Sequence, residues 1–412
     1  MRNDKFNPHA LNLLKERGLI HTMSHPTELA DALARGPVTF YLGIDPTADN
    51  LHIGHFFAMQ VFKILQDHGH NGVLLIGNAT AMIGDPSFKN DMRKLLTKEE
   101  VDHNAREISA LLDRFIDTKH AKIVYNADWM RGENFINFMR EVGTHFNVAK
   151  MLSAECYKNR LREGGLTFFE MGYMLMQSYD FVHLNDAHGV TLQIGGSDQW
   201  GNIVAGVELG RKMALKNGNP RPLLMALCNP LLVKADGTKM GKTEKGTLWV
   251  SRDKDGAYNA YQHFVNVFDE DVERLLMFFT DLSVKEVKQM CEANIVVAKK
   301  RMAYEVTKKI HGVEEADAAR ATSEKLFSSA SVDTPPADTP TETIKLSPGA
   351  TIADILAQTS IIKSKREARE LITSGAIYLD NTKITDINFI PTTTSLLIRK
   401  GKKTYLRIVT KA

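Results

Sequence analysis

Two histidines flank an isoleucine–glycine pair at His52-Ile53-Gly54-His55, directly after a segment rich in turn-forming residues. The imidazoles are three positions apart, so they share one helix face if a helix begins near Asn50. A helix N-terminus offers free N–H groups and partial positive charge to a phosphate, and imidazoles donate hydrogen bonds. Gly54 would let a nucleotide base approach the backbone. The tetrapeptide therefore favours a nucleotide site over an ordinary helix start.

A second cationic motif lies in the segment "KADGTKMGKTEKG", where Lys239 and Lys242 flank a glycine and Thr243 follows. Two lysines in a glycine-rich loop could close over phosphates. By itself, a Lys-x-x-Lys loop is more commonly a solvated turn. Its value as a site therefore depends on the first motif.

Strand-like and helix-like segments alternate over the first 230 residues, as in "VTFYLGI", "FFAMQVFKILQDHG" and "GVLLIG". Such alternation predicts an α/β fold with a Rossmann-like, doubly wound parallel sheet, whose ligands bind at the carboxyl ends of the strands. Polar residues follow the predicted strands at that edge: Tyr41, Gly43, Asp45 and Thr47; then Asp85, Lys89 and Arg93; and later Gly195, Gly196, Asp198 and Gln199. Each is weak evidence alone, because Gly and Asp are common in turns. Together they outline a polar crevice.

A third pattern lies in "TFFEMGYMLMQSYDFVHL", where Tyr173, Gln177 and Asp180 fall at i, i+4 and i+7. That spacing places the three side chains on one stripe of an otherwise apolar helix. An amphipathic helix with its polar side in water is the ordinary explanation. Here the neighbouring apolar residues leave little solvated face, and buried polar groups need partners. A ligand that supplies those partners is the prediction.

"HIGH" and "KMGKT" together resemble the paired HIGH and KMSKS signatures of class I aminoacyl-tRNA synthetases, with Gly241 in place of the middle serine. The segments "YLGIDPTADNLHIGH", "IGDPS", "YMLMQSYDF" and "GGSDQWGN" extend the match to the bacterial type of tyrosyl-tRNA synthetase over essentially the whole chain. The resemblance implies an enzyme that activates L-tyrosine with ATP, accompanied by Mg²⁺, and transfers it to the 3′ end of tRNA(Tyr).

The resemblance also implies a role for each matching residue. For the amino acid, Tyr41 and Asp180 would bind the phenol; Asp85, Tyr173 and Gln177 the ammonium; and Gln199 would lie beside the substrate. For ATP, the contacts would come from Gly43, Asp45, Thr47, His52, Gly54, His55, Gly196 and Asp198. The pyrophosphate would be surrounded by Lys239, Lys242, Thr243, Lys89 and Arg93. Leu42 departs from this branch, which commonly has a small thiol there, so one ribose contact is expected to be missing.

The C-terminal segment is the basic part of the chain. From Ile344 onward, twelve Lys and Arg oppose five Asp and Glu, a net charge of +7, although the whole chain carries only +3. Ser364 and Glu367 form a capping box before a short helix that Gly375 ends, and two short strands are expected around Asp380. The expected tRNA contacts are Lys363, Lys365, Arg366 and Arg369, although a solubilising face would also be basic.

The expected domains follow from these segments. A catalytic domain with an insertion at about 100–190 is followed by a KMSKS-type loop, a helical anticodon-side domain, a Pro-rich linker and a small basic α+β RNA-binding domain. Their ranges are 1–230, 231–250, 251–327, 328–343 and 344–412. The apolar segment "FINFMREVGTHFNVAKML" would form the interface of a homodimer, although internal packing would explain the same pattern.

Bulk properties exclude several classes. The 412 residues are 43% apolar and 25% charged, as in soluble globular proteins, and no apolar run approaches the 18 residues that predict a membrane span. The cysteines Cys156, Cys228 and Cys291 are widely separated, which predicts reduced thiols in a cytoplasmic protein and no metal site.

Three alternatives remain at this point. A tryptophanyl-tRNA synthetase would share the fold but would not be expected to carry the Tyr41/Asp180 pair or the basic tail. A non-catalytic RNA-binding descendant would be expected to have degraded ATP motifs. A ligase for a small acid would not need the helical domain and tail.

Overall fold

The computed structural model of the chain describes most of its 412 residues. The described residues are 6–86, 95–163, 165–218, 221–238, 240–243, 246–251, 253–327, 341–345, 349–362, 364–380, 382–391, 393, 395–401 and 404–411. The chain is divided into two compact units. The first consists of Met1–Met240 and Glu273–Lys288, and the second of Gly241–Val272 and Gln289–Ala412.

The first unit is built on a six-stranded sheet with the order β1-β6-β5-β2-β3-β4. The strands are β1 (Thr22–Met23), β2 (Thr39–Ile44), β3 (Asn71–Ile76), β4 (Ala121–Tyr125), β5 (Leu192–Gly196) and β6 (Met225–Asn229). β2 to β6 pair in parallel, and only β1 is antiparallel to its neighbour. The strand order reverses between β2 and β5, which is where a doubly wound sheet opens to a ligand. The predicted fold class is confirmed.

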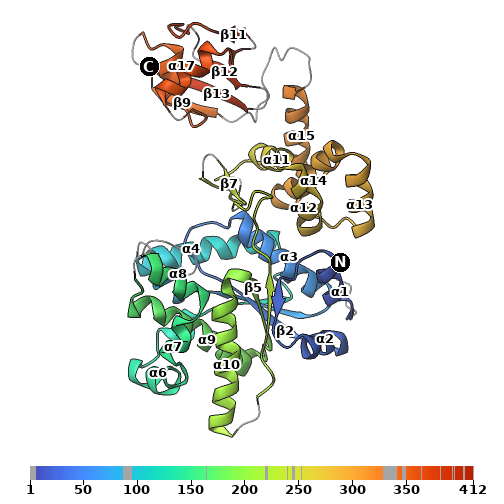
Figure 1. The fold of residues 1–412 in the computed structure, drawn as a ribbon, viewed down its shortest axis with the longest axis vertical. Coiled ribbons are helices and arrows are strands. Elements are labelled where there is room, and N and C mark those ends of the chain that lie inside the picture. The colour runs from blue at the N-terminus through green and yellow to red at the C-terminus, as the bar shows by residue number, and fades with distance from the viewer. Residues whose placement is uncertain are drawn as a thin grey trace. The chain divides into compact units, whose positions relative to one another are not determined.

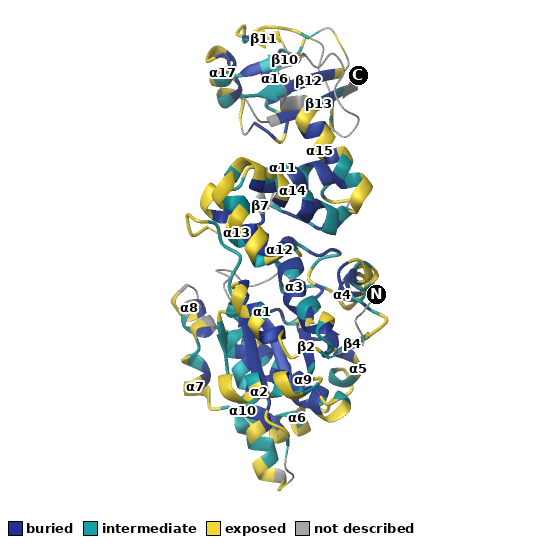
Figure 2. Ribbon diagram, turned by 90° about the vertical axis from the view of Figure 1, so that its right-hand side faces the viewer, coloured by how far each residue is buried: buried dark blue, intermediate teal, exposed yellow. Residues whose placement is uncertain are grey.

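Helices lie on both faces of this sheet (Figure 1). They are α1 (Ala10–Glu16), α2 (Pro26–Arg35), α3 (Ile53–Asp67), α4 (Lys98–Leu111), α5 (Ala127–Met130), α6 (Phe135–Glu141), α7 (Val148–Leu152), α8 (Glu155–Glu163), α9 (Phe168–His188) and α10 (Trp200–Asn217). Because both faces are covered, the central strands are nearly all buried (Figure 2). Tyr41 on β2 and Phe181 on α9 belong to the core between the sheet and these helices.

The main sheet reaches into the range 100–190 that was expected to be an insertion. β4 pairs with β3 along its whole length. The segment between β4 and β5 contains α5 to α9, and α9 is its longest helix. Thr167 caps α9 through the N–H of Glu170, and Gly189, at φ 65°, ends it.

The described residues 253–327, where a helical domain was expected, contain five α-helices. These are α11 (Ala257–Val265), α12 (Val272–Phe279), α13 (Val284–Ala293), α14 (Ile295–His311) and α15 (Val313–Phe327). The expected boundary at residue 251 is wrong for Glu273–Lys288, which belongs to the first unit. There, Arg17 donates hydrogen bonds to the carbonyl oxygens of Met277 and Thr280, each at 2.8 Å, and Phe278 packs against Phe57.

The second unit also contains a small hairpin, β7 (Lys242–Thr243) with β8 (Gly246–Thr247). Part of the expected KMSKS-type loop at 231–250 is therefore an antiparallel strand pair.

The C-terminal module has its own sheet and core. Its strands β9 (Thr341–Lys345), β10 (Ile377–Leu379), β11 (Thr382–Ile384), β12 (Ser395–Lys400) and β13 (Thr404–Lys411) lie in the order β11-β10-β12-β13-β9. Helices α16 (Ile352–Leu356) and α17 (Lys365–Thr373) contribute to an aliphatic core with these strands. The expected cap is present, since the Ser364 hydroxyl accepts from the N–H of Glu367 at 3.1 Å.

The expected linker end at residue 343 is wrong. Thr341–Thr343 belong to β9, which pairs in parallel with β13. The sequence did not predict this strand, because the polar residues that alternate in the strand directly follow a Pro-rich run. Residues 328–340 of the expected linker lie outside the described residues.

Candidate active site

The two histidines of the first motif cap the start of helix α3. His52 is the N-cap residue, and its Nδ1 accepts hydrogen bonds from the N–H of Gly54 at 3.1 Å and of His55 at 3.3 Å. His55 Nδ1 accepts in return from the N–H of His52 at 3.3 Å. The rings stack with centroids 3.8 Å apart. The arrangement is a capping box built from two imidazoles.

This geometry corrects one expectation and sharpens another. The N–H groups of Gly54 and His55 were expected to be free for a phosphate, but His52 already binds them. Because each Nδ1 accepts a hydrogen bond, the proton of each neutral ring lies on Nε2, which can donate to a ligand. Burial and the neighbouring His52 lower the pKa of His55 well below its ordinary value, so this ring is neutral at pH 7.

A buried phenol lies at the centre of the sheet. Tyr41 is fully buried on β2, and its hydroxyl has no hydrogen-bond partner among the residues that the structure describes. Burial and the nearby carboxyl of Asp180 raise the pKa of Tyr41 well above its ordinary value, so it stays protonated. A buried hydroxyl without a partner is costly, and such groups are rare in folded proteins. Tyr41 is therefore suited to bind a polar group of a ligand.

Asp180 is a buried carboxyl held by two donors. Its Oδ2 accepts from Asn126 Nδ2 at 3.0 Å and its Oδ1 from Trp129 Nε1 at 2.8 Å. Burial raises the pKa of Asp180 to about 8, and the two hydrogen bonds oppose that rise. Perturbed carboxyls of this kind cluster at functional sites. Asp180 and Tyr41 thus form a pair that could recognise a ligand hydroxyl from both sides.

Asp45 joins the end of β2 to the helix that carries Asp180. Its Oδ1 accepts from Thr80 Oγ1 at 2.7 Å, and its Oδ2 accepts from the hydroxyl of Tyr173 at 2.9 Å. Gly77 leaves room for this contact, because a Cβ at that position would overlap Asp45 Oδ1 and Thr80 Oγ1. The glycine is therefore required by close approach and not by its backbone angles.

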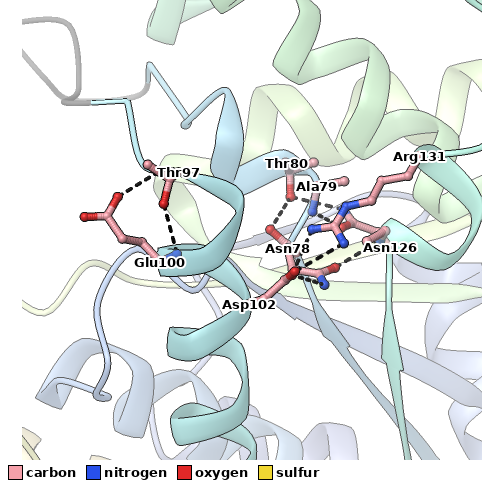
Figure 3. A network of polar contacts seen from close by, with 10 residues as sticks. Asn78, Ala79, Thr80, Thr97, Glu100, Asp102, Asn126 and Arg131 are labelled. Atoms are coloured by element: carbon pink, nitrogen blue, oxygen red, sulfur yellow. Dashed lines mark hydrogen bonds and ion pairs between the residues drawn. The ribbon is translucent and has the colours of Figure 1, made fainter.

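Asn126 organises the neighbouring strand ends (Figure 3). Its Oδ1 accepts from the N–H of Ala79 at 2.7 Å, and its Nδ2 donates to Thr80 Oγ1 at 3.1 Å as well as to Asp180. Asn78 makes a second connection between the same two segments, since its Oδ1 accepts a hydrogen bond from the N–H of Ala127 at 3.0 Å. β3 and β4 are thereby tied together just beyond their carboxyl ends.

An ion pair lies at the edge of the same network. Arg131 Nη2 is 2.8 Å from Asp102 Oδ1, and this oxygen also accepts from Asn78 Nδ2 at 3.4 Å (Figure 3). The Arg131 hydrogen bond lowers the pKa of Asp102. The pair fastens helix α4 to the loop that follows α5.

Two further predicted residues contact each other after the end of β5. Gln199 Nε2 donates to Asp85 Oδ2 at 2.6 Å, and Asp85 is buried. Gly196 has no space for a Cβ beside Asp198 Oδ1, so a glycine is needed there. Gln177 on α9 has a buried Oε1 that no described residue binds by a hydrogen bond. This amide is a second group that a ligand could satisfy.

Among the residues predicted to bind the amino acid, Gln199 contacts Asp85, and Tyr173 contacts Asp45; the roles of the whole set stay predictions. Thr47 and Gly43 are exposed at the carboxyl end of β2. Lys89, Arg93, Lys239 and Lys363 lie outside the described residues. Lys242 and Thr243 form β7 of the second unit, and their roles stay predictions.

Sequence reasoning missed Asn126, Trp129 and Thr80. All three follow the carboxyl ends of β3 or β4. The rule that ligands bind beyond such ends could have found them, because the segment "AKIVYN" is strand-like and Asn126 is its last residue. Their partners, however, are far away in the sequence, and only the fold reveals them.

Comparison with known proteins places this geometry in a class. The family description "tRNA synthetases class I (W and Y)" matches residues 33–328, and "Tyrosine--tRNA ligase SYY-like C-terminal domain" matches residues 334–408. The chain belongs to the class I tRNA synthetases of the tryptophan and tyrosine group.

Relatives narrow the assignment within that class. The chain is 45% identical to a tyrosine–tRNA ligase from Clostridium kluyveri, over 97% of this chain and 99% of the relative. A tyrosine–tRNA ligase from Clostridium tetani is 46% identical, over 97% of this chain and 98% of its own. A C-terminally truncated mitochondrial tyrosyl-tRNA synthetase of Aspergillus nidulans is similar in structure, with 28% identity and a TM-score of 0.69 over 77% of this chain and 94% of that chain. Among the synthetases of its class, the chain thus groups with the bacterial tyrosine–tRNA ligases.

Proposed function

We propose that this chain activates L-tyrosine with ATP and transfers the tyrosyl group to tRNA(Tyr). In this proposal, L-tyrosine and ATP bind at the carboxyl ends of β2, β3 and β5. The observation that carries the proposal is the unpartnered hydroxyl of Tyr41 beside the Asp180 carboxyl. A tyrosine phenol would donate to an oxygen of the Asp180 carboxyl and accept from the Tyr41 hydroxyl. A tryptophan indole has a donor but no such acceptor, so this pair favours tyrosine.

The amino end of the substrate is assigned to the polar residues around Asp45. Its ammonium needs acceptors, and Asp85, Gln177 Oε1 and the Tyr173 hydroxyl supply them. The buried Oε1 of Gln177 lacks a hydrogen-bond partner, so an ammonium there would remove a cost. Gln199, which holds Asp85 at 2.6 Å, would lie beside the substrate.

ATP is assigned to the region between α3 and the end of β5. The Nε2–H groups of His52 and His55 would donate to the phosphates and ribose, with Thr47 alongside. Gly43, Asp45, Gly54, Gly196 and Asp198 would line the base and ribose. Lys89, Arg93, Lys239, Lys242 and Thr243 are assigned to the leaving pyrophosphate on their motifs alone.

The first step joins tyrosine to the nucleotide. A carboxylate oxygen of tyrosine attacks the α-phosphorus of ATP, the bond to the β-phosphate oxygen breaks, and pyrophosphate leaves. The carboxylate is already ionised at neutral pH, so no general base is needed. The chain's task is therefore to position the reactants and stabilise charge.

The second step transfers the tyrosyl group. A ribose hydroxyl at the 3′ end of the tRNA attacks the carbonyl carbon of the adenylate, and AMP leaves with the bonding electrons. Magnesium would accompany ATP and neutralise phosphate charge. No group of three or more His, Cys, Asp or Glu within the described ranges could hold a metal ion.

The C-terminal module is assigned to tRNA binding, through Lys363, Lys365, Arg366 and Arg369. The net charge of +7 from Ile344 onward and the match of residues 334–408 to a tyrosine–tRNA ligase C-terminal domain support this assignment. Arg366 and Arg369 are exposed on α17, and Arg366 pairs with Glu370 at 3.0 Å. Such exposed pairs are weak, so phosphates could displace the carboxylate.

A homodimer and a cytoplasmic location complete the proposal. Large apolar side chains are exposed on the segment that precedes and begins α9: Phe135 (69%), Ile136 (65%), Val148 (57%) and Phe168 (71%). Exposed apolar groups of this size favour an interface with a second copy. Analytical ultracentrifugation tests whether the chain is a dimer.

No helix among the described residues has the length and apolarity required to cross a membrane.

Replacement of Asp180 by alanine tests the proposed function. Asp180→Ala removes the acceptor for the substrate phenol, so discrimination against phenylalanine should fall. Tyrosyl-tRNA synthetases are the standard example of such discrimination, which is about 10⁵. The measurement is pyrophosphate exchange with each amino acid. An unchanged ratio of kcat/KM for tyrosine and phenylalanine would contradict the proposal.

A further inference from the structure

The indole of Trp129 is held from two directions. One edge donates Nε1–H to Asp180 at 2.8 Å. One face stacks on the imidazole of His183, with ring centroids 4.3 Å apart and an interplanar angle of 17°. Asp180 and His183 are three positions apart on α9, so both lie on the same side of that helix. The indole therefore spans the buried carboxyl and the imidazole of a single helix.

The backbone beneath Trp129 contributes little rigidity of its own. α5 consists only of Ala127–Met130, a single turn. Trp129 and His183 are both partly exposed, whereas Asp180 is buried. The indole also packs against the core that contains Tyr41 and Phe181, and the His183 stack supports one of its faces.

The surroundings of His183 keep its ring neutral and in place. Burial is the main cause of its lowered pKa; His188 lowers it further, and Asp186 and Glu133 oppose that effect. Tyr179 lies on the next turn at a ring distance of 6.3 Å and donates to Glu133 at 3.1 Å. Lys122 on β4 contacts His188 at 3.0 Å and does not pair with His183 in any described contact.

We propose that His183 is a positioning residue for tyrosine selection, which acts by holding Trp129 at the Asp180 carboxyl. The proposal rests on the proposed role of Asp180 as acceptor of the substrate phenol. His183 touches no substrate in this scheme. It keeps one of the two donors of Asp180 aligned, so that the carboxyl presents its remaining acceptor positions to the phenol in one orientation.

Pyrophosphate exchange with two amino acids tests the proposal. In His183→Ala, KM for tyrosine should rise about fivefold, the size expected for losing one aromatic stack, with kcat unchanged. KM for phenylalanine should not change, because phenylalanine makes no bond to Asp180. His183→Phe should restore the wild-type ratio, since a phenyl ring can stack in the same place. His188→Ala, on the same helix but away from Trp129, is the matched control.

A double-mutant cycle tests whether His183 affects tyrosine selection through Trp129. Trp129→Phe keeps a stacking ring but loses the Nε1 donor, and it should reduce tyrosine selection. The double variant Trp129→Phe/His183→Ala should then be no worse than Trp129→Phe alone. Additive losses, or an equal rise of KM for both amino acids in His183→Ala, would overturn the proposal. The proposed function would still stand if Asp180→Ala abolished discrimination.

Fluorescence supplies a readout that is independent of activity. A protonated imidazole in contact with an indole quenches its emission, and the chain has three tryptophans. Because burial lowers the pKa of His183 below its ordinary value of about 6.5, wild-type emission should fall only at a pH below that value. His183→Phe should lack this step and His188→Ala should keep it. Identical titrations of wild type and His183→Phe would refute the stack in solution.

Discussion

At the scale of single residues, the site is built from groups that are costly to the fold. Asp180 is buried with a pKa of about 8, and the Tyr41 hydroxyl has no partner. Neither group would be selected for stability, because burial penalises both the charge and the missing hydrogen bond. Their arrangement is explained if a bound phenol supplies the missing contacts. In that case, these residues lower the stability of the fold and favour binding of the phenol.

The pH dependence of stability should reveal the cost of Asp180. Its folded pKa of about 8 exceeds the ordinary value of 3.8, so its contribution to stability is greatest below pH 3.8 and is lost as the pH rises through 8. Relative to Asp180→Asn, wild type should lose up to about 1.4 kcal/mol of unfolding free energy per pH unit across this window. Urea denaturation at pH 5, 6 and 7 measures it; parallel pH curves for the two proteins would argue against a buried, titrating carboxyl.

His70 should produce the opposite dependence. Its Nδ1 accepts the N–H of Val38 at 3.1 Å just before β2, and burial lowers its pKa to about 4. A lowered histidine pKa stabilises the fold above pH 6.5, and this stability is lost as the pH falls toward 4. Acidification from pH 6.5 to 5 should cost about 2 kcal/mol. His70→Gln, whose amide oxygen can accept the same N–H, should remove this dependence in chemical denaturation; an unchanged dependence would show that other groups cause it.

At the scale of elements, the ends of the parallel strands decide the site. β2, β3, β4 and β5 all end at one edge, so Asp45, Thr80, Asn126 and Asp198 come from distant segments but follow neighbouring strands. Helix α9 crosses this edge with Tyr173 and Asp180 on one stripe. Helix α9 can contact the end of β2 only if there is space beside that strand end, and Gly77 leaves this space because it has no side chain.

Gly77→Ala should therefore damage the site more than its size suggests. The new methyl group must displace Asp45 or Thr80, which breaks their 2.7 Å hydrogen bond and disturbs the Tyr173 contact. We expect about 1–3 kcal/mol of lost stability, the usual cost of overpacking, and weaker tyrosine binding. Thermal unfolding and equilibrium dialysis with tyrosine measure the two effects. Gly36→Ala, where a Cβ would meet nothing within 4 Å, is the control; equal effects of both substitutions would contradict the steric account.

At the scale of the whole molecule, the chemistry and the tRNA contacts are predicted to be separable. The C-terminal module has its own core, which includes Ile344, Leu396 and Ile408. Its first strand begins at Thr341, so a deletion that respects the fold must end before that residue. A cut at residue 343, the boundary expected from the sequence, would remove most of β9 from its sheet.

Truncation after Phe327 tests this separation. Adenylate formation, measured by pyrophosphate exchange with tyrosine, should be retained. Aminoacylation of tRNA should fall by about tenfold or more, on the order expected when several phosphate contacts are lost, and its salt dependence should flatten. Full aminoacylation by the truncated chain would show that the basic module serves another purpose.

The sequence by itself determined the class of fold and the motifs and predicted the candidate residues of the site, because strand alternation and fixed spacings are local properties. The tertiary structure alone decided which of those residues touch. It gave Asp180 the donors Asn126 and Trp129, closed the imidazole pair of His52 and His55 into a cap, and assigned Thr341–Thr343 to a strand and Glu273–Lys288 to the first unit. The physical reason is that hydrogen bonds and burial depend on distance in space, and residues far apart in the chain carry no local signal of their meeting.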